Sequence, residues 1–206
     1  MESDDVGFSN ASNSSSIIQV DFESIKPGIF NTASLKAVFE STAPWSNGLE
    51  EGRAEIVQEE RNQFLRIGYV GNEFGPSRGG VQFSVPLSKA YSELFLSYRL
   101  RFSDGFDFVR EGKLPGFVGG TAPTGCVSDK HGFSARNMWR GGGVAVQYLY
   151  SPNKISACGD DYIYKKDGVE QKFTTGRWQT IEHRLVMNTP GLNDGVLQAW
   201  IDGQLV

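Results

Sequence analysis

The chain is poor in the residues from which metal centres are usually built. Its 206 residues include two histidines and two cysteines, which do not make a convincing zinc site. It also contains no phosphate-binding Gly-x-x-x-x-Gly-Lys-Ser/Thr loop and no His-Glu-x-x-His segment. These absences disfavour P-loop nucleotide hydrolases and zinc proteases. We expect neither a metal nor another cofactor.

Excess positive charge and long apolar runs are also missing. Lysine and arginine number 20 against 24 acidic residues, which gives a net charge of −4 and a pI of about 5.3. Nucleic-acid-binding domains usually carry a basic surface, so a nucleic-acid partner is disfavoured. No apolar run approaches the roughly 20 residues that span a bilayer, so we expect no membrane partner. A few basic residues in one site can still bind a polyanion.

The residues that are abundant favour β structure. Aromatic residues make up 12% of the chain, and glycines number 25. Short aromatic and β-branched runs alternate with Gly, Pro, Asn and Asp, which predicts an all-β fold. We expect a jelly-roll β-sandwich of two antiparallel sheets with a concave substrate cleft. Expected strands are 17–22, 54–57, 64–70, 81–85, 93–102, 178–187 and 196–201, with short helical turns near 34–39 and 87–91.

The domain organisation is expected to be simple. Residues 1–16 are polar and rich in Ser and Asn, which predicts a flexible tail. The remainder, 17–206, is expected to form a single domain. Residues 200–206 read as a strand, an Asp-Gly turn and the start of another strand. One interpretation is therefore a domain that is truncated at its C-terminus.

A hairpin is the most informative feature of the sequence. Three glycines at 141–143 separate two strand-like runs. If these glycines form the loop, Ser134 lies opposite Tyr150 and Arg136 opposite Tyr148, all on one sheet face. A two-residue loop would shift the register by one and place Arg136 and Tyr148 on opposite faces. Stacking of arginine on tyrosine could serve structure alone, but the added serine hydroxyl favours a functional site.

Further polar residues lie near this hairpin. Lys113 is found in Gly-Lys-Leu-Pro-Gly at 112–116, where we expect a defined turn; an exposed surface lysine is the alternative. Arg140 shares the hairpin face, and His131 lies in the polar loop that enters it. His183 alternates with apolar residues, which predicts a core-facing or edge histidine with a satisfied hydrogen bond.

The two cysteines bracket the hairpin. Cys126 and Cys158 each lie beside a glycine in a predicted loop. We expect a disulfide, because other features point to a protein outside the cell. Two free thiols in a cytosolic protein are the alternative.

The polar groups of the hairpin suit one way of breaking a sugar chain. A glycoside hydrolase needs paired carboxylates, and none converge in this region. Lysine, arginine, serine and tyrosine instead suit β-elimination at a uronic acid. Such an enzyme neutralises the sugar carboxylate, removes the C5 proton and protonates the departing O4. Arginine or lysine can supply the first step, and lysine or tyrosine can transfer the protons.

Several segments resemble polysaccharide lyase family 14, over roughly residues 60–206. They are Gly-Lys-Leu-Pro-Gly at 112–116, Gly-Phe-Ser-Ala-Arg-Asn-Met-Trp-Arg at 132–140, Tyr-Leu-Tyr-Ser-Pro at 148–152, Gly-Arg-Trp-Gln-Thr-Ile at 176–181, Asn-Thr-Pro-Gly at 188–191 and Ala-Trp-Ile-Asp-Gly at 199–203. The resemblance implies a β-jelly roll with a catalytic lysine, a substrate-contacting Ser-x-Arg and a Tyr-x-Tyr pair. By that resemblance Lys113 is the lysine.

The function expected from these observations is a secreted, monomeric lyase that cleaves alginate, an acidic polysaccharide, by β-elimination. A glucuronan lyase and a non-catalytic carbohydrate-binding jelly roll are the alternatives. The expected catalytic residues are Lys113, Tyr148 and Tyr150, and the expected substrate-binding residues are Ser134, Arg136, Arg140 and His131.

Overall fold

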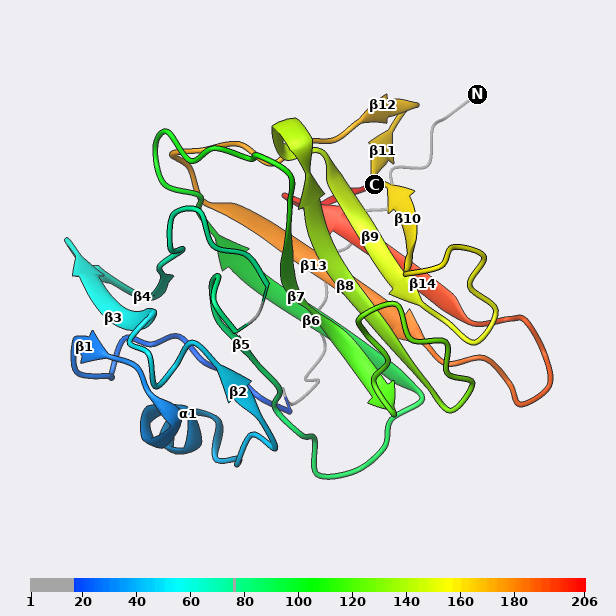
Figure 1. Cartoon of the computed structure of the whole chain (residues 1–206), viewed down its shortest axis with the longest axis horizontal. Helices are drawn as coiled ribbons and strands as arrows, with labels where there is room; N and C mark the ends of the chain where they lie inside the picture. Colours follow the sequence, from blue (N-terminus) through cyan, green and yellow to red (C-terminus); the bar gives the residue numbers. More distant parts are fainter. Residues whose placement is uncertain (1–16, 76) are drawn as a thin grey trace, which may run out of the picture. The chain divides into compact units, whose positions relative to one another are not determined.

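The computed structural model describes residues 17–75 and 77–206. The chain divides into two compact units, of which the first ends at Ala90 and the second runs from Tyr91 to Val206 (Figure 1). The tail predicted for residues 1–16 lies outside the described residues. The single domain predicted for 17–206 stays a prediction.

The first unit combines short strands with one helix. Its sheet has the antiparallel order β1-β3-β4, and a second pair joins β2 to β5. The buried side chains of Phe30, Leu35, Leu49, Ala54 and Ile56 form its core. The elements are β1 (Gly28–Ile29), α1 (Thr32–Phe39), β2 (Ser46–Asn47), β3 (Ala54–Glu59), β4 (Asn62–Ile67) and β5 (Gln82–Phe83).

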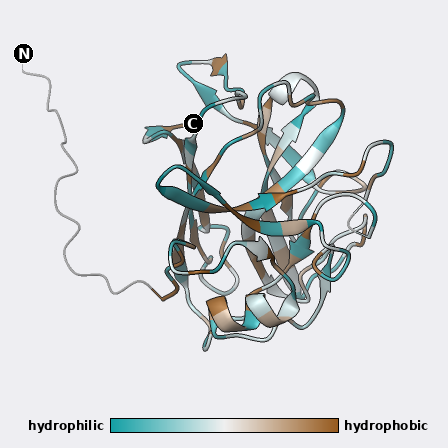
Figure 2. Cartoon of the chain, turned by 90° about the vertical axis from the view of Figure 1, so that its left-hand side faces the viewer, coloured by the Kyte–Doolittle hydropathy of each residue, from teal (hydrophilic) through white to brown (hydrophobic). Residues whose placement is uncertain are grey.

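Helix α1 has defined ends. The side chain of Asn31 accepts a hydrogen bond from the Ser34 amide at 3.0 Å, which caps the N-terminus. At the other end Glu40 adopts a left-handed conformation with φ of 49°. The helix carries both hydrophobic and hydrophilic residues (Figure 2), and Leu35 is buried in the unit core. The helical turn predicted near 34–39 is therefore confirmed.

The second unit contains two four-stranded antiparallel sheets, with the orders β10-β9-β8-β7 and β15-β14-β13-β6. This arrangement confirms the predicted all-β sandwich of antiparallel sheets. A small pair joins β11 to β12. The elements are β6 (Glu93–Leu100), β7 (Glu111–Gly120), β8 (Gly132–Arg140), η1 (Gly141–Gly143), β9 (Ala145–Tyr150), β10 (Asp160–Ile163), β11 (Lys165–Lys166), β12 (Val169–Glu170), β13 (Gln179–Val186), β14 (Val196–Ile201) and β15 (Gln204–Leu205).

Aromatic and aliphatic side chains fill the space between these two sheets. The ring of Phe102 lies 5.3 Å from that of Trp139 and 5.8 Å from that of Phe173. Ile181 and Ile201 pack into the same cluster from the opposing sheet. Strands β8 and β9 lie in front of β13 and β14 in Figure 1. The strands therefore alternate between side chains that face this core and side chains that face away from it.

The hairpin of β8 and β9 has the register that a three-glycine loop predicts. Ser134 lies opposite Tyr150, and Arg136 lies opposite Tyr148. The loop is the three-glycine turn Gly141–Gly143. The four polar side chains therefore share one face of the sheet.

Backbone conformation explains why this loop needs glycine. Gly142 has φ of 67° and Gly143 has φ of 82°, a region that glycine enters without steric cost. The Arg140 amide donates to the Val144 carbonyl at 2.8 Å and closes the loop.

Strand β7 differs from the prediction. The turn expected at 112–116 is wrong, because Lys113 lies within a ten-residue strand. The register shifts by one between Lys113 and Gly116, so that Leu114 and Pro115 occupy a β-bulge. A bulge accommodates proline because proline has no amide hydrogen to donate and a bulge leaves one ladder hydrogen bond unformed. The Pro-Gly signal therefore marked a bulge in a strand.

Two further expectations are wrong. Residues 17–22 form no strand; Phe22 has φ of 63°, and its carbonyl accepts a turn hydrogen bond from Ile25 at 3.1 Å. Residues 87–91 form bends and irregular chain, since so short a segment gains little from helical hydrogen bonds. The expected strand 196–201 appears with its predicted ends. The remaining expected strands appear with shifted ends, and 81–85 is reduced to Gln82–Phe83.

A polar network lies between the two sheets, behind the hairpin. Asn137 and Gln147 face each other across β8 and β9, and both are buried. The Tyr164 hydroxyl donates to both side-chain carbonyls. Asn137 and Tyr98 also donate to the Pro115 carbonyl, at 3.1 and 3.3 Å. The network thereby ties the bulge of β7 to the interior.

His183, in β13, matches one part of its prediction and contradicts the other. The prediction that it faces the core is confirmed, since its side chain is fully buried and its ring lies 5.2 Å from that of Phe117. The predicted hydrogen bond is wrong, because neither ring nitrogen has a partner among the described residues. Burial without a partner disfavours the charged form and lowers the pKa of His183 to about 4.

This histidine makes folding stability depend on pH. The unfolded chain takes up the His183 proton near its ordinary pKa of 6.5, whereas the folded chain resists it down to about 4. The contribution of neutral His183 to the free energy of unfolding is therefore fully present above pH 6.5. About 3 kcal/mol of it is lost as the pH falls towards 4. Urea unfolding across this window should show a smaller loss for His183→Leu than for the unsubstituted protein.

The matched control is Ile181→Val, at a buried position of the same strand that does not titrate. Its free energy of unfolding should fall with pH as steeply as that of the unsubstituted protein. An equal slope for His183→Leu and the unsubstituted protein would contradict this account of His183.

Candidate active site

The sheet of β7 to β10 presents the predicted catalytic residues on its outer face. The neighbouring positions Trp139 and Ala145 point into the core, so the alternate positions of β8 and β9 point outward. Lys113 pairs with Met138 on this face despite the bulge. We call this set the site cluster: Lys113, Ser134, Arg136, Tyr148 and Tyr150.

Arg136 places a buried positive charge at the centre of the cluster. Its residue surface is 8% exposed. Nη2 donates to the Ser134 hydroxyl at 3.4 Å, and Nε has no partner among the described residues. The guanidinium carbon lies 5.7 Å from the ring centroid of Tyr148 and 5.8 Å from that of Tyr150. No carboxylate of the described chain pairs with this guanidinium.

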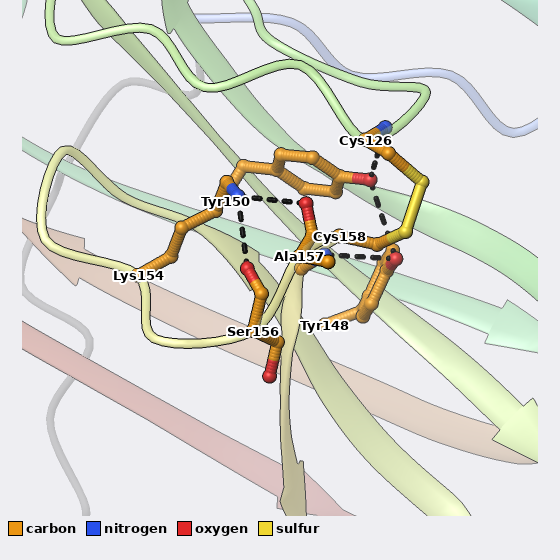
Figure 3. Close-up of a disulfide and its surroundings, with 8 residues drawn as sticks. Cys126, Tyr148, Tyr150, Lys154, Ser156, Ala157 and Cys158 are labelled. Carbon is orange, nitrogen blue, oxygen red and sulfur yellow. Dashed lines mark hydrogen bonds between the residues drawn. A yellow bond between two sulfur atoms is a disulfide. The ribbon is translucent and has the colours of Figure 1, made fainter.

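The two tyrosine hydroxyls meet beside this charge. The phenolic oxygens lie 3.3 Å apart, and the rings are perpendicular. Tyr150 accepts from the Cys126 amide at 3.1 Å, and Tyr148 accepts from the Gly159 amide at 3.0 Å (Figure 3). Each oxygen therefore receives a backbone donor from a different loop.

These contacts separate the two phenols chemically. Burial opposes ionisation of Tyr150, but hydrogen bonds from Tyr148 and the Cys126 amide, together with Arg136 and Lys113, lower its pKa. Burial and the hydrogen bond to Tyr150 raise the pKa of Tyr148. Tyr150 is therefore the phenol that gives up its proton first.

Lys113 occupies the open side of the cluster. Its residue surface is exposed, and Nζ lies 5.8 Å from the ring centroid of Tyr148. Desolvation of the ammonium group, followed by the charge of Arg136, lowers the pKa of Lys113, while Tyr150 acts in the opposite direction. Lys113 is thus both accessible and easier to deprotonate than an ordinary lysine.

Ser134 is buried completely. Its hydroxyl donates to the Pro123 carbonyl at 2.8 Å and accepts from Arg136. Pro123 belongs to loop 121–131, between β7 and β8. The contacts of Ser134 therefore link this loop to the guanidinium.

Arg140 and His131, the other predicted binding residues, have different surroundings. The Arg140 guanidinium pairs with Glu111 and with Asp161, the latter at 2.7 Å, and lies 5.1 Å from the ring centroid of Tyr148. Its charge is thus already paired. His131 is exposed, and its amide donates to Asp129 at 2.7 Å. The contacts of the described residues do not join His131 to the site cluster.

Two residues that contact the tyrosines of the site cluster were not predicted from the sequence. Lys154 donates to the Ser156 and Ala157 carbonyls, both at 2.9 Å, and its Nζ lies 5.9 Å from the ring centroid of Tyr150 (Figure 3). Gly159 supplies the amide that contacts Tyr148. The only signal for Gly159 was its position next to a cysteine, and a backbone donor leaves no trace in residue type.

The predicted disulfide is confirmed. Cys126 in loop 121–131 is bonded to Cys158 in loop 151–159, which lies between β9 and β10. Among the described residues no group of three His, Cys, Asp or Glu side chains could hold a metal ion. Residues 17–75 and 77–206 include no helix that is long and apolar enough to cross a membrane.

Comparison with known proteins identifies the family of the chain. The model of the polysaccharide lyase 14 family matches residues 57–206. The chain belongs to the polysaccharide lyase 14 family. It is accordingly a lyase, and the predicted recognition is confirmed. No curated protein matches the chain.

Solved structures share the fold at low sequence identity. Alginate lyase Aly36B is 24% identical with a TM-score of 0.79, covering 92% of this chain and 76% of its own. Alginate lyase vAL-1 from Chlorella virus is 23% identical with a TM-score of 0.66, covering 88% and 80%. The marine alginate lyase from Aplysia kurodai is 21% identical with a TM-score of 0.67, covering 87% and 76%. A mutant of Aly36B has been solved with an alginate tetrasaccharide.

The charge of Arg136, with which no carboxylate of the described residues pairs, should reduce stability. A buried cation without an acidic partner loses hydration and regains only part of it from tyrosine rings. Arg136→Met should leave the free energy of unfolding unchanged or raise it by up to about 2 kcal/mol. Arg140→Met is the comparison, because it breaks ion pairs and should lower stability by about 1 kcal/mol. Urea unfolding measures both, and a clear loss in Arg136→Met alone would contradict the argument.

Proposed function

We propose that the protein depolymerises a uronic-acid polysaccharide, and alginate in particular, by β-elimination. The observation that carries the proposal is the buried guanidinium of Arg136, which has no acidic partner in the described chain. A uronate carboxylate supplies the missing negative charge. The lyase family and the fold shared with alginate lyases support this choice of substrate.

The site cluster can divide the reaction among its residues. Arg136 holds the carboxylate of the sugar and stabilises the negative charge that develops next to C5. Neutral Lys113 takes the C5 proton, the electrons of that C–H bond form the C4–C5 double bond, and the C4–O4 bond breaks. Tyr150 donates its proton to O4, and the resulting phenolate is stabilised by Tyr148 and the Cys126 amide.

The remaining members of the cluster position these groups. Ser134 orients Arg136 through its hydroxyl, and Tyr148 holds the Tyr150 oxygen at 3.3 Å. Arg140 lies against the ring of Tyr148 while its charge is paired with Glu111 and Asp161. We further propose that the enzyme acts outside the cell, which the disulfide supports.

The substrate is tested by incubating the protein with polymannuronate, polyguluronate, mixed alginate and glucuronan. Each elimination creates an unsaturated uronate, whose ultraviolet absorbance measures turnover. We expect a rise with at least one alginate block. A rise with glucuronan alone would replace alginate as the substrate, and no rise with any polymer would overturn the lyase assignment for this site.

The residue roles are tested in the same assay. Lys113→Met and Tyr150→Phe should each lower kcat by about 10²- to 10⁴-fold, because each removes a proton-transfer group. Lys165→Met and Tyr162→Phe are matched controls at exposed positions of the same unit. Wild-type turnover in either site variant would contradict its assigned role.

The protonation states required also predict a pH profile. Lys113 acts neutral, and desolvation and the charge of Arg136 lower its pKa; Tyr150 acts protonated, and its pKa is lowered as well. Turnover should therefore rise from neutral into alkaline pH and then fall as Tyr150 ionises. Initial rates measured across this range check the profile. An optimum on the acidic side of neutrality would exclude neutral Lys113 as the base.

A further inference from the structure

We propose that the Cys126–Cys158 disulfide is a positioning element of the active site, which holds two backbone amides against the phenolic oxygens of Tyr150 and Tyr148. The inference rests on the proposed function for the roles of these tyrosines. It adds that the disulfide sets their proton-transfer properties, in addition to stabilising the fold.

The geometry places each half of the disulfide next to one phenol. The Cys126 amide itself donates to Tyr150 at 3.1 Å. On the other side the donor to Tyr148 is the amide of Gly159, the residue that follows Cys158, at 3.0 Å. The sulfur–sulfur bond therefore joins the two donors across the pair of oxygens, as Figure 3 shows.

The backbone at Cys126 is one that needs external support. Cys126 has φ of 66° and follows Gly125, with φ of 63°. A side chain with a Cβ rarely adopts this left-handed region, and such strain persists only where surrounding contacts fix it. The same residue carries both the sulfur and the amide that contacts Tyr150. The bond to Cys158 thus holds the donor in a conformation that the free loop would leave.

Hydrogen bonds within loop 151–159 fix its own conformation but do not fix its position against loop 121–131. Lys154 donates to the Ser156 and Ala157 carbonyls, and Asp160 accepts from the Ile155 and Ser156 amides. These bonds lie within the loop and its junction with β10. Among the hydrogen bonds, ion pairs and disulfides of the described residues, only the disulfide and the tyrosine pair connect this loop to loop 121–131.

Gly159 shows how closely the anchored loop approaches the rings. A Cβ at this position would lie 2.7 Å from Cε2 of Tyr148 and 2.8 Å from Cε2 of Tyr150. The backbone of the loop is thus in contact with both rings, and only glycine fits. The disulfide holds the loop at this distance, where its amide reaches the Tyr148 oxygen.

The test measures the tyrosines directly. The protein is labelled with ¹³Cζ-tyrosine, the two resonances are assigned with Tyr148→Phe and Tyr150→Phe, and each is titrated by NMR. The comparison is between the oxidised protein and Cys126→Ser/Cys158→Ser. We expect the pKa of Tyr150 to rise by about one unit in the double variant, because a donor to the phenolate is lost, and kcat to fall by about tenfold or more.

The control separates positioning from stability. Ile201→Val lowers stability in the core of the same unit while keeping the disulfide. When this variant is measured equally far below its own Tm, the pKa values of Tyr148 and Tyr150 and the kcat should equal those of the unsubstituted protein. Unchanged titrations of both tyrosines in the folded double variant would overturn the proposal.

A second variant covers the case in which the double variant does not fold. Gly159→Ala keeps the disulfide but forces its Cβ against the rings. It should shift the titration of Tyr148 and lower kcat by about tenfold or more, and normal values for both would overturn the proposal. Because the titrations need no substrate, an unsubstituted protein that cleaves no uronate polymer would refute the proposed function while leaving the titration test of the disulfide intact.

Discussion

The pairing of Arg136 with Tyr148 across β8 and β9 is the constraint on which the proposed active site depends. A shift of one residue in this pairing would place the two side chains on opposite faces of the sheet. The register is fixed from the opposite face, where Asn137 and Gln147 meet in a buried polar network and Trp139 packs into the aromatic core. The packing of the interior and the geometry of the site are therefore set by the same ladder of hydrogen bonds.

Burying the charge of Arg136 costs folding free energy. A well-packed sheet face would pair or omit the charge of Arg136, whereas this one surrounds it with phenols and a hydroxyl. The neighbouring Arg140 has two carboxylates, so acidic partners are available in the same sheet. Among the described residues no carboxylate pairs with Arg136, which in the proposed function leaves its charge for the substrate and is typical of sites where stability and activity oppose each other.

The sequence was sufficient for features that repeat along a strand or follow from residue type. Alternation located β6 and β13, the glycines at 141–143 defined the hairpin register, and the cysteines were correctly paired. The sequence-based prediction was wrong where the same local residue pattern is compatible with two structures. Leu114 and Pro115 read as a turn but form a bulge. The amide donors to the tyrosines could not be predicted, because every residue except proline has one.

Two glycines of β7 leave room for aromatic rings of β8, so the residues allowed on one strand depend on those of the other. Gly112 lies directly opposite Trp139, and Gly119 lies opposite Phe133. A Cβ at Gly112 would come within 2.0 Å of the Trp139 ring, and one at Gly119 within 2.4 Å of the Phe133 ring. A larger residue on one strand is therefore tolerated only with a smaller ring on the other. The two pairs should covary among homologous sequences, and neither strand can be redesigned without its partner.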